Sequence, residues 1–233
     1  MLSREELLSG ELIVEGRLVD ASNATLFGKV LTSDQSSFSV VYKPIAGERA
    51  LWDFADGNLA SREIAAYLIS EAGQFNCVPL TVMRDGPFGI GAVQQWIDLD
   101  SDRDLIAIGQ QSTPPIRNLA LFDVVINNTD RKFGHILPIS DSEILGCDHG
   151  LTFHEEFKLR TVLWQYAGQE LVRDEASKLE SLKLSISGDI GAALGELITK
   201  DEIDSLLERI DMLISDGFPY PSEQWPAVPW PPV

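Results

Sequence analysis

Two short polar runs in this chain of 233 residues place carboxylates where they could serve phosphoryl transfer. The first run, residues 127–135, directly follows an apolar stretch and contains Asp130, and the second, residues 147–150, ends another apolar stretch and contains Asp148. In phosphoryl transfer one aspartate can orient the attacking hydroxyl group, while another holds a magnesium ion that neutralises the nucleotide phosphates. The alternative is structural: Asp130 pairs with Arg131 within its loop, and Asp148 caps a turn.

A lysine and a glutamate upstream of these runs favour the chemical interpretation. Lys43 ends an apolar stretch typical of a strand and is followed by Pro44, so its side chain should be rigidly placed on a sheet, where it can pair with phosphates. Glu63 lies in the next expected helix, and an ion pair between such a lysine and glutamate fixes the lysine in kinase-like lobes. Taken singly, Lys43 would be a solvated strand end and Glu63 a surface helix residue. The order of the four residues along the chain is what favours phosphoryl transfer.

The elements that must position these residues differ between the two halves of the chain. A capping box at Ser3 and Glu6 opens a short helix, after which strands joined by polar turns alternate with one longer amphipathic helix. The expected strands span residues 11–18, 24–32, 37–43, 80–83 and 91–97, with a turn at 85–87, and the longer helix spans residues 59–71. The first hundred residues are therefore predicted to form a five-stranded sheet, beginning as an antiparallel meander, with one helix.

The remainder of the chain shows a helical pattern. The expected helices span residues 116–126, 174–184, 190–198 and 201–214, with two short strands at 136–137 and 144–147. Residues 218–233 are rich in proline and tryptophan and cannot be helical. Their two tryptophans favour an extended strap that packs over a lobe, and the alternative is a free tail that recruits another protein. We expect an N-lobe at residues 1–97, a C-lobe at 98–217 and this strap.

Four motifs give the chain a resemblance to a known family. They lie between Tyr42 and Phe153 and read Tyr42-Lys43-Pro44, Arg62-Glu63-Ile64-Ala65-Ala66-Tyr67-Leu68, Asn128-Thr129-Asp130-Arg131 and Asp148-His149-Gly150-Leu151-Thr152-Phe153. With them the chain resembles the phosphatidylinositol 3- and 4-kinase-like branch of the protein-kinase superfold. It is most similar to the type II phosphatidylinositol 4-kinases, in particular to short bacterial members of the actinobacterial type. The resemblance implies an α+β, bilobal protein-kinase-like fold with an antiparallel-sheet N-lobe, one helix in that lobe and a mainly helical C-lobe.

The same resemblance implies a role for each motif. Lys43 would contact the phosphates of ATP and act in catalysis, and Glu63 would hold Lys43 in place. Asp130 would be the catalytic aspartate, and Asp148 would bind the magnesium ion. The hinge that holds adenine would be Gln94-Gln95-Trp96-Ile97.

Two features depart from the family pattern. Five residues after the catalytic aspartate the family carries an asparagine that binds a second metal ion, whereas this chain has His135. Because imidazole suits softer ions than magnesium, His135 is expected to shift the preference toward manganese or to leave only one ion bound, unless it is an ordinary loop histidine. The chain also lacks a glycine-rich phosphate loop. Ser22 and Asn23, in the turn between the first two strands, could cradle phosphates instead, or could form a plain turn.

Composition restricts the partners. The chain has 18 Lys and Arg residues against 36 Asp and Glu residues, and its formal net charge of −18 opposes binding to phosphate backbones and anionic membranes. We expect no nucleic-acid partner and no stable membrane insertion, and a protein or small-molecule acceptor is as plausible as an inositol lipid. The two cysteines lie in apolar runs typical of buried free thiols. The first residues lack the features of a secretion signal, which favours a cytoplasmic location.

Three functions remain open from the sequence. The joint presence of the lysine, the glutamate and the two aspartates favours a kinase that uses ATP with Mg²⁺ or Mn²⁺ and an unknown phosphate acceptor. His135 favours a nucleotide-binding pseudokinase that acts as a regulator. The proline- and tryptophan-rich tail by itself favours a scaffold that recruits a protein partner.

Overall fold

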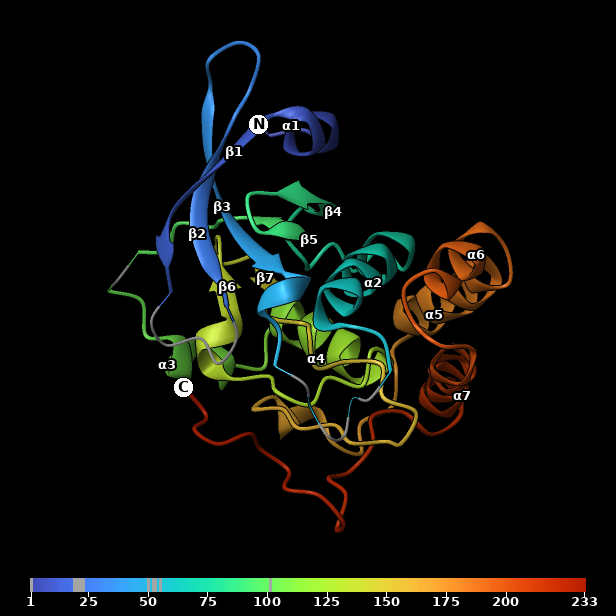
Figure 1. Ribbon diagram of the computed structural model, residues 1–233. Coiled ribbons are helices and arrows are strands. Elements are labelled where there is room, and N and C mark those ends of the chain that lie inside the picture. The colour runs from blue at the N-terminus through green and yellow to red at the C-terminus, as the bar shows by residue number, and fades with distance from the viewer. Residues whose placement is uncertain (1, 19–23, 50, 52–53, 55, 101) are drawn as a thin grey trace.

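The computed structural model describes residues 2–18, 24–49, 51, 54, 56–100 and 102–233. It shows a sheet-rich lobe built from the first hundred residues and a mainly helical lobe built from the rest (Figure 1). The predicted α+β, bilobal architecture is confirmed. No helix within the described ranges combines the length and the apolar composition that a membrane span requires.

The N-lobe sheet places the side chain of Lys43 on the side that faces the C-lobe. Its five antiparallel strands are arranged in the order β1-β2-β3-β5-β4. They are β1 (Glu11–Arg17), β2 (Leu26–Leu31), β3 (Ser37–Pro44), β4 (Thr81–Gly86) and β5 (Gly89–Gln95). Lys43 lies opposite Ala92, and Val41 lies opposite Gln94. Because side chains alternate between the two faces of a strand, these four side chains share one face of the sheet.

The opposite face of the sheet is covered by the first helix, α1 (Arg4–Ser9). This helix begins with the predicted capping box, in which the Ser3 hydroxyl oxygen accepts from the backbone N–H of Glu6. Its residue Leu7 is fully buried in a cluster with valines of the central strands. One face of the sheet is therefore covered by α1. On the other face Ala92 packs with Ala60 and Ile64, and the part around Lys43 and Gln94 forms a cleft wall.

Helix α2 (Leu59–Ala72) lies between the sheet and the helices of the C-lobe, and most of its residues are buried (Figure 1). The side-chain oxygen of Asn58 accepts from the N–H of Ser61 in the first turn. The carboxylate of Glu48 accepts from the two preceding N–H groups of that turn, at 2.8 Å each. The first turn is thus satisfied without solvent, which lets α2 begin inside the molecule.

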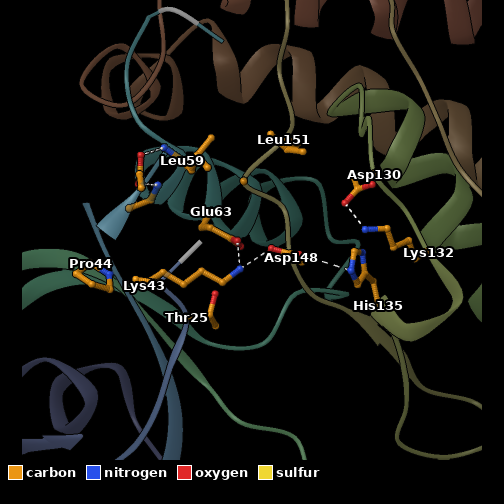
Figure 2. A pocket seen from close by; sticks show the side chains of 14 residues that line it. Thr25, Lys43, Pro44, Leu59, Glu63, Asp130, Lys132, His135, Asp148 and Leu151 are labelled. Carbon is orange, nitrogen blue, oxygen red and sulfur yellow. Dashed lines mark hydrogen bonds and ion pairs between the residues drawn. The ribbon is translucent and has the colours of Figure 1, made fainter. Parts of the chain in front are cut away.

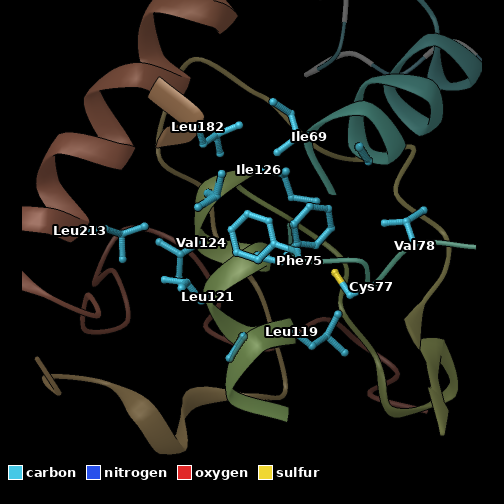
Figure 3. Packing of buried hydrophobic residues seen from close by; sticks show 14 of the residues in the cluster. Ile69, Phe75, Cys77, Val78, Leu119, Leu121, Val124, Ile126, Leu182 and Leu213 are labelled. Atoms are coloured by element: carbon cyan, nitrogen blue, oxygen red, sulfur yellow. The ribbon is translucent and has the colours of Figure 1, made fainter. Parts of the chain in front are cut away.

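The C-lobe is organised around α4 (Pro114–Val125), which begins with proline in its first turn. Figure 3 shows its apolar side chains packed between Ile69 of α2, Leu182 of α5 and Leu213 of α7. The other helices are α3 (Leu105–Gly109), α5 (Arg173–Ile186), α6 (Asp189–Gly195) and α7 (Lys200–Asp216). The short elements are β6 (Ile136–Pro138), β7 (Ile144–Gly146), η1 (Ile45–Gly47), η2 (Phe133–His135) and η3 (Trp164–Tyr166). Burial of α4 from several directions fixes the polar loop that leaves its end.

Some predicted boundaries were wrong. The helix expected at residues 190–198 ends at Gly195, and α3 was not predicted because five residues are too few to show a helical period. Strands β4 and β5 continue through most of the expected turn, so that only Pro87 and Phe88 form the tip of the hairpin.

Residues 218–233 form neither helix nor strand and run along the C-lobe (Figure 1). Phe218 is buried against the Tyr166 ring and the guanidinium of Arg117. Further along, the carbonyl of Pro232 accepts from the backbone N–H of Phe133, within the polar run of residues 127–135, at 2.8 Å. The expectation that both tryptophans would be buried was wrong, because Trp230 is 89% exposed. The strap is held by Phe218 and by backbone hydrogen bonds.

Candidate functional site

Lys43 connects the two lobes through ion pairs. Its Nζ donates to Oε1 of Glu63 in α2 and, at 2.7 Å, to Oδ1 of Asp148 in the C-lobe (Figure 2). The Glu63 side chain is only 2% exposed. The alternative of a solvated strand end and a surface helix residue is therefore wrong for this pair.

The charges at this junction stabilise one another. Burial alone lowers the pKa of the Lys43 ammonium group, but the carboxylates of Asp148 and Glu63 outweigh burial and raise that pKa above its ordinary value. The Lys43 ammonium in turn holds the pKa of Asp148 well below its usual range. The Lys43 ammonium and the Asp148 carboxylate are therefore both charged at neutral pH, and the half-exposed Asp148 carboxylate remains open to a ligand.

Asp148 is fixed by the turn that follows β7. The backbone N–H of His149 donates to Oε2 of Glu63 at 3.1 Å, so the glutamate that holds Lys43 also holds this turn. A Cβ atom at Gly150 would lie only 3.2 Å from the Cβ of Leu59, which explains why a glycine allows the turn to approach α2. The predicted lysine, glutamate and second aspartate are thus brought together.

Asp130 lies on the loop that follows α4, on the same cavity. Its backbone N–H donates to Oδ1 of Asn128, and its carboxylate accepts from Nζ of Lys132 at 2.9 Å (Figure 2). The structural alternative of an ion pair between Asp130 and Arg131 is wrong. The carboxylate of Asp130 is available at the surface of the cavity, with Lys132 beside it.

Arg131 instead forms the buried centre of the C-lobe loops. Its guanidinium pairs with the fully buried carboxylate of Asp123 at 2.9 Å and donates to the carbonyl oxygens of His135 and Cys147. It also lies 2.8 Å from Nε2 of His149. Arg131 therefore ties the loop that carries Asp130 to the turn that carries Asp148. In the sequence, an aspartate at position 123 within an apolar helix indicates that a buried cation pairs with it.

A cation could bind between three of these side chains. Asp130, His135 and Asp148 each offer a ligand atom, and these atoms lie within 4.8 Å of one another. Nε2 of His135 is 3.5 Å from Oδ2 of Asp148. Burial lowers the pKa of His135, which keeps the imidazole neutral and able to ligate. Two carboxylates and one imidazole suit Mn²⁺ better than Mg²⁺.

The expected hinge borders an apolar part of the cleft. A cavity of about 390 Å³ is lined by Gln95, Trp96 and Ile97 on the hinge and by Leu137 and Cys147 of the C-lobe. Ser22 and Asn23, the expected phosphate cradle, lie outside the described residues. Their neighbours Ala24 and Thr25 line the cavity beside Lys43.

Lys132 is a candidate residue that the sequence interpretation missed. It lines the same cavity as Lys43, and it adds a second ammonium group on the side of Asp130. Its position two residues after Asp130, within the polar run, was the available indication.

Comparison with known sequences relates nearly the whole chain to a mycobacterial protein. No protein-family model matches the chain. Protein Rv2133c of Mycobacterium tuberculosis is 39% identical over an alignment of 261 positions that covers 97% of this chain and 93% of that protein. This chain belongs to the Rv2133c family. Outside that family, phosphatidylinositol 4-kinase gamma 4 of Oryza sativa subsp. japonica is 26% identical over 129 residues, which cover 47% of this chain and 23% of the plant protein.

Solved structures show what fold this Rv2133c-family chain adopts. The Golgi casein kinase with Mn/ADP bound is similar over 91% of this chain and 73% of its own, with a TM-score of 0.60 and 12% identity. Hydra Fam20 with sugar is similar over 90% of this chain and 85% of its own, with a TM-score of 0.60 and 13% identity. At such low identity the likeness concerns the fold alone, and it confirms the predicted protein-kinase-like fold.

Proposed function

We propose that this chain is an ATP-dependent phosphotransferase of the phosphatidylinositol 3-/4-kinase-like type, which transfers a phosphoryl group to an alcohol. The observation that carries the proposal is the convergence, on one cavity, of the Lys43–Glu63–Asp148 ion pairs with the carboxylate of Asp130. The likeness to a Mn/ADP-bound kinase and the partial match to a plant phosphatidylinositol 4-kinase support it. The four sequence motifs support the finer assignment.

In this proposal the two lysines bind phosphates and the hinge binds the base. Lys43 exchanges the carboxylate of Asp148 for phosphate oxygens, while Glu63 keeps the ammonium group in position. Lys132 offers a second cation near the point of transfer. Gln95, Trp96 and Ile97 border the space for adenine. The N-lobe at residues 1–97 is then the nucleotide-binding lobe, and residues 98–217 carry the catalytic loop.

In this proposal the two aspartates have different roles, one in binding the cation and the other in orienting the acceptor. Asp148 and His135 would hold a divalent cation, with Asp130 at its edge. A bound Mg²⁺ or Mn²⁺ supplies positive charge to the phosphate oxygens. Asp130 orients the acceptor hydroxyl and receives its proton, because it is the carboxylate that Lys43 does not engage. The acceptor is a protein, a small molecule or an inositol lipid.

The test combines binding and turnover. The melting temperature is measured over a grid of ATP and ADP with Mg²⁺ and Mn²⁺, since a ligand of the native state stabilises it by RT ln(1 + [L]/Kd). Lys43→Ala should abolish the nucleotide-dependent shift, and Asp148→Asn should remove its metal-dependent part. Lys29→Ala, at a half-exposed residue outside the cavity lining, and Asp141→Asn, at an exposed residue, should behave as wild type. A flat melting temperature across the whole grid would refute the proposal.

One observation favours a second candidate, a nucleotide-binding pseudokinase. His135 stands where the resembling family binds a second metal ion through asparagine, and an imidazole there reduces the oxygen ligands available to Mg²⁺. This second function would be assigned if nucleotide and metal raise the melting temperature, but neither ATP hydrolysis nor phosphoryl transfer is detected with Mg²⁺ or with Mn²⁺.

A further inference from the structure

The back wall of the base-binding part of the cleft holds a buried glutamine. Gln94 of β5 is 7% exposed, and its side chain shares the face of the sheet that carries Val41 and Lys43. It lines both of the cavities, about 410 and 390 Å³, that lie between Trp96 and Cys147. A polar group at this position meets any base that enters the cleft.

A chain of two hydrogen bonds fixes the orientation of the Gln94 amide. The hydroxyl of Thr81 donates to the carbonyl oxygen of Pro79 at 2.7 Å, because a carbonyl oxygen can only accept. The oxygen of Thr81 then acts as acceptor for Nε2 of Gln94, at 2.8 Å. With Nε2 turned toward Thr81, Oε1 of Gln94 points away from it.

The other end of the amide is free to bind a ligand. Within the described residues Oε1 has no hydrogen-bond partner, and it is not among the polar atoms sealed away from solvent. The cleft wall therefore presents a hydrogen-bond acceptor that Pro79 and Thr81 prevent from becoming a donor.

We propose that Gln94 selects the nucleobase: its Oε1 accepts a hydrogen bond from the 6-amino group of adenine and rejects a 6-oxo purine. The inference rests on the proposed function, since it takes the cleft to hold a nucleotide. An amino group is a donor and completes the bond, whereas the 6-oxo group of guanine or hypoxanthine is an acceptor and leaves two oxygens facing each other. A site built to bond a donor discriminates strongly against a ligand that lacks it.

Three nucleoside diphosphates that differ only at position 6 of the purine separate the loss of the hydrogen bond from the added repulsion in the wild-type protein. ADP carries the 6-amino group, purine riboside diphosphate carries hydrogen at that position, and inosine diphosphate carries oxygen. Loss of the amino group should weaken binding about tenfold, which corresponds to one hydrogen bond and its unpaired partner. The oxo group should weaken binding about 100-fold or more, because it adds a repulsive contact. Affinities are measured by isothermal titration calorimetry in the presence of Mn²⁺.

Variants show whether Gln94 and its orientation cause the preference. Gln94→Met keeps the length of the side chain, and the ratio of the inosine diphosphate Kd to the ADP Kd should fall at least fivefold. Thr81→Val removes the acceptor that holds Nε2, so the amide can turn and the same ratio should fall, although Thr81 does not line either cavity. Thr81→Ser keeps the hydroxyl and should restore the wild-type ratio. Gln110→Met makes the same change at an exposed glutamine and should leave the ratio as in wild type.

The outcomes distinguish this inference from the proposed function. Binding of ADP with a ratio that is unchanged in Gln94→Met and Thr81→Val overturns the assignment of Gln94 alone. Wild-type protein that binds none of the three diphosphates overturns the proposed function together with this inference. A variant that is partly unfolded has less binding-competent protein for both ligands, so the ratio of the two Kd values does not change for that reason.

Discussion

At the scale of single residues, the lysines and aspartates of the site form ion pairs with one another when no ligand is bound. Lys43 pairs with Asp148, and Asp130 pairs with Lys132, so each lysine and each aspartate that would meet phosphate or metal already has a partner of opposite charge. Phosphate and cation therefore compete with internal ion pairs. When the phosphates of a nucleotide bind Lys43, its ion pair with Asp148 breaks and the Asp148 carboxylate can bind a cation. Nucleotide binding and cation binding should therefore strengthen each other.

Asp130→Asn should separate chemistry from binding. The carboxylate of Asp130 contacts Lys132 and not Lys43, so its removal leaves the nucleotide contacts in place. A residue that orients the acceptor acts in the transition state, and its loss should lower kcat about 10²- to 10⁴-fold. The Kd for ADP, measured by calorimetry without a divalent cation because Asp130 also offers one of the three cation-ligand atoms, should change less than threefold. An equal loss of turnover and affinity would make Asp130 a structural residue.

His135→Asn should change the order of metal preference. In wild type the imidazole favours Mn²⁺, and the amide oxygen of asparagine is a hard ligand that suits Mg²⁺. We expect the ratio of thermal shifts with ADP in Mn²⁺ and in Mg²⁺ to move toward Mg²⁺ in the variant. His154→Asn, at a histidine outside the cluster, serves as control. If both variants keep the wild-type ratio, His135 does not bind the cation.

The residue pairs show what could be read from the sequence and what could not. Lys43 and Glu63 were predictable because each lies at a fixed place in a strongly patterned strand or helix. The partners of Asp130 and Arg131 were not, because the sequence does not tell that a guanidinium will turn inward to a carboxylate eight residues earlier, at Asp123. The fixed orientation of the Gln94 amide likewise depends on a contact made across two strands.

At the scale of elements, α2 is held to the C-lobe by the residue next to Glu63. The guanidinium of Arg62 donates to the carbonyl oxygen of Thr152 at 2.6 Å and pairs with Glu202 of α7 at 2.5 Å. Both ends of this ion pair are buried. Helix α2 cannot shift without breaking it, so the position of Glu63 depends on a helix that begins far later in the chain.

Glu202→Ala should therefore impair both stability and binding. It leaves the buried Arg62 guanidinium without its carboxylate and removes the capping box of α7, and the expected loss is about 3–5 kcal/mol of the free energy of unfolding. ADP binding below the melting temperature should also weaken, because Glu63 moves with Arg62. Glu208→Ala, at an exposed position of the same helix, should cost less than about 0.5 kcal/mol in denaturant titrations. A destabilised variant with normal ADP affinity would show that α2 holds its position without α7.

The boundaries of strands and helices were predictable where the hydrophobic periodicity extends over many residues. The strands around Lys43 and the long helices followed from periodicity, whereas α3 has five residues and no resolvable period. The strap could be excluded from helices by its prolines, but the exposure of Trp230 depends on which surface the strap meets.

At the scale of the whole molecule, acidic residues outnumber basic residues both in the chain as a whole and in the lining of the cavity. The net charge is −18, and Lys43 and Lys132 line the cavity beside Asp148 together with Glu48, Glu63 and Asp130. The two lysines are the ammonium groups of this lining that could bind phosphate, within a molecule that repels anions at longer range. This arrangement admits a nucleotide that reaches the cleft and disfavours extended anionic surfaces.

The distribution predicts that the protein will not bind anionic membranes. Each lysine or arginine at an anionic leaflet contributes about 1 kcal/mol of attraction, and acidic residues on the same surface oppose it. Sedimentation with vesicles that contain phosphatidylserine and phosphatidylinositol should leave the protein in the supernatant, as with neutral phosphatidylcholine vesicles. The result should hold both near 10 mM salt, where the Debye length is about 30 Å, and near 150 mM, where it is about 8 Å. Because repulsion is strongest at low salt, any binding that appears only there would reveal a local basic patch, and it would return an inositol lipid to the first place among the acceptors.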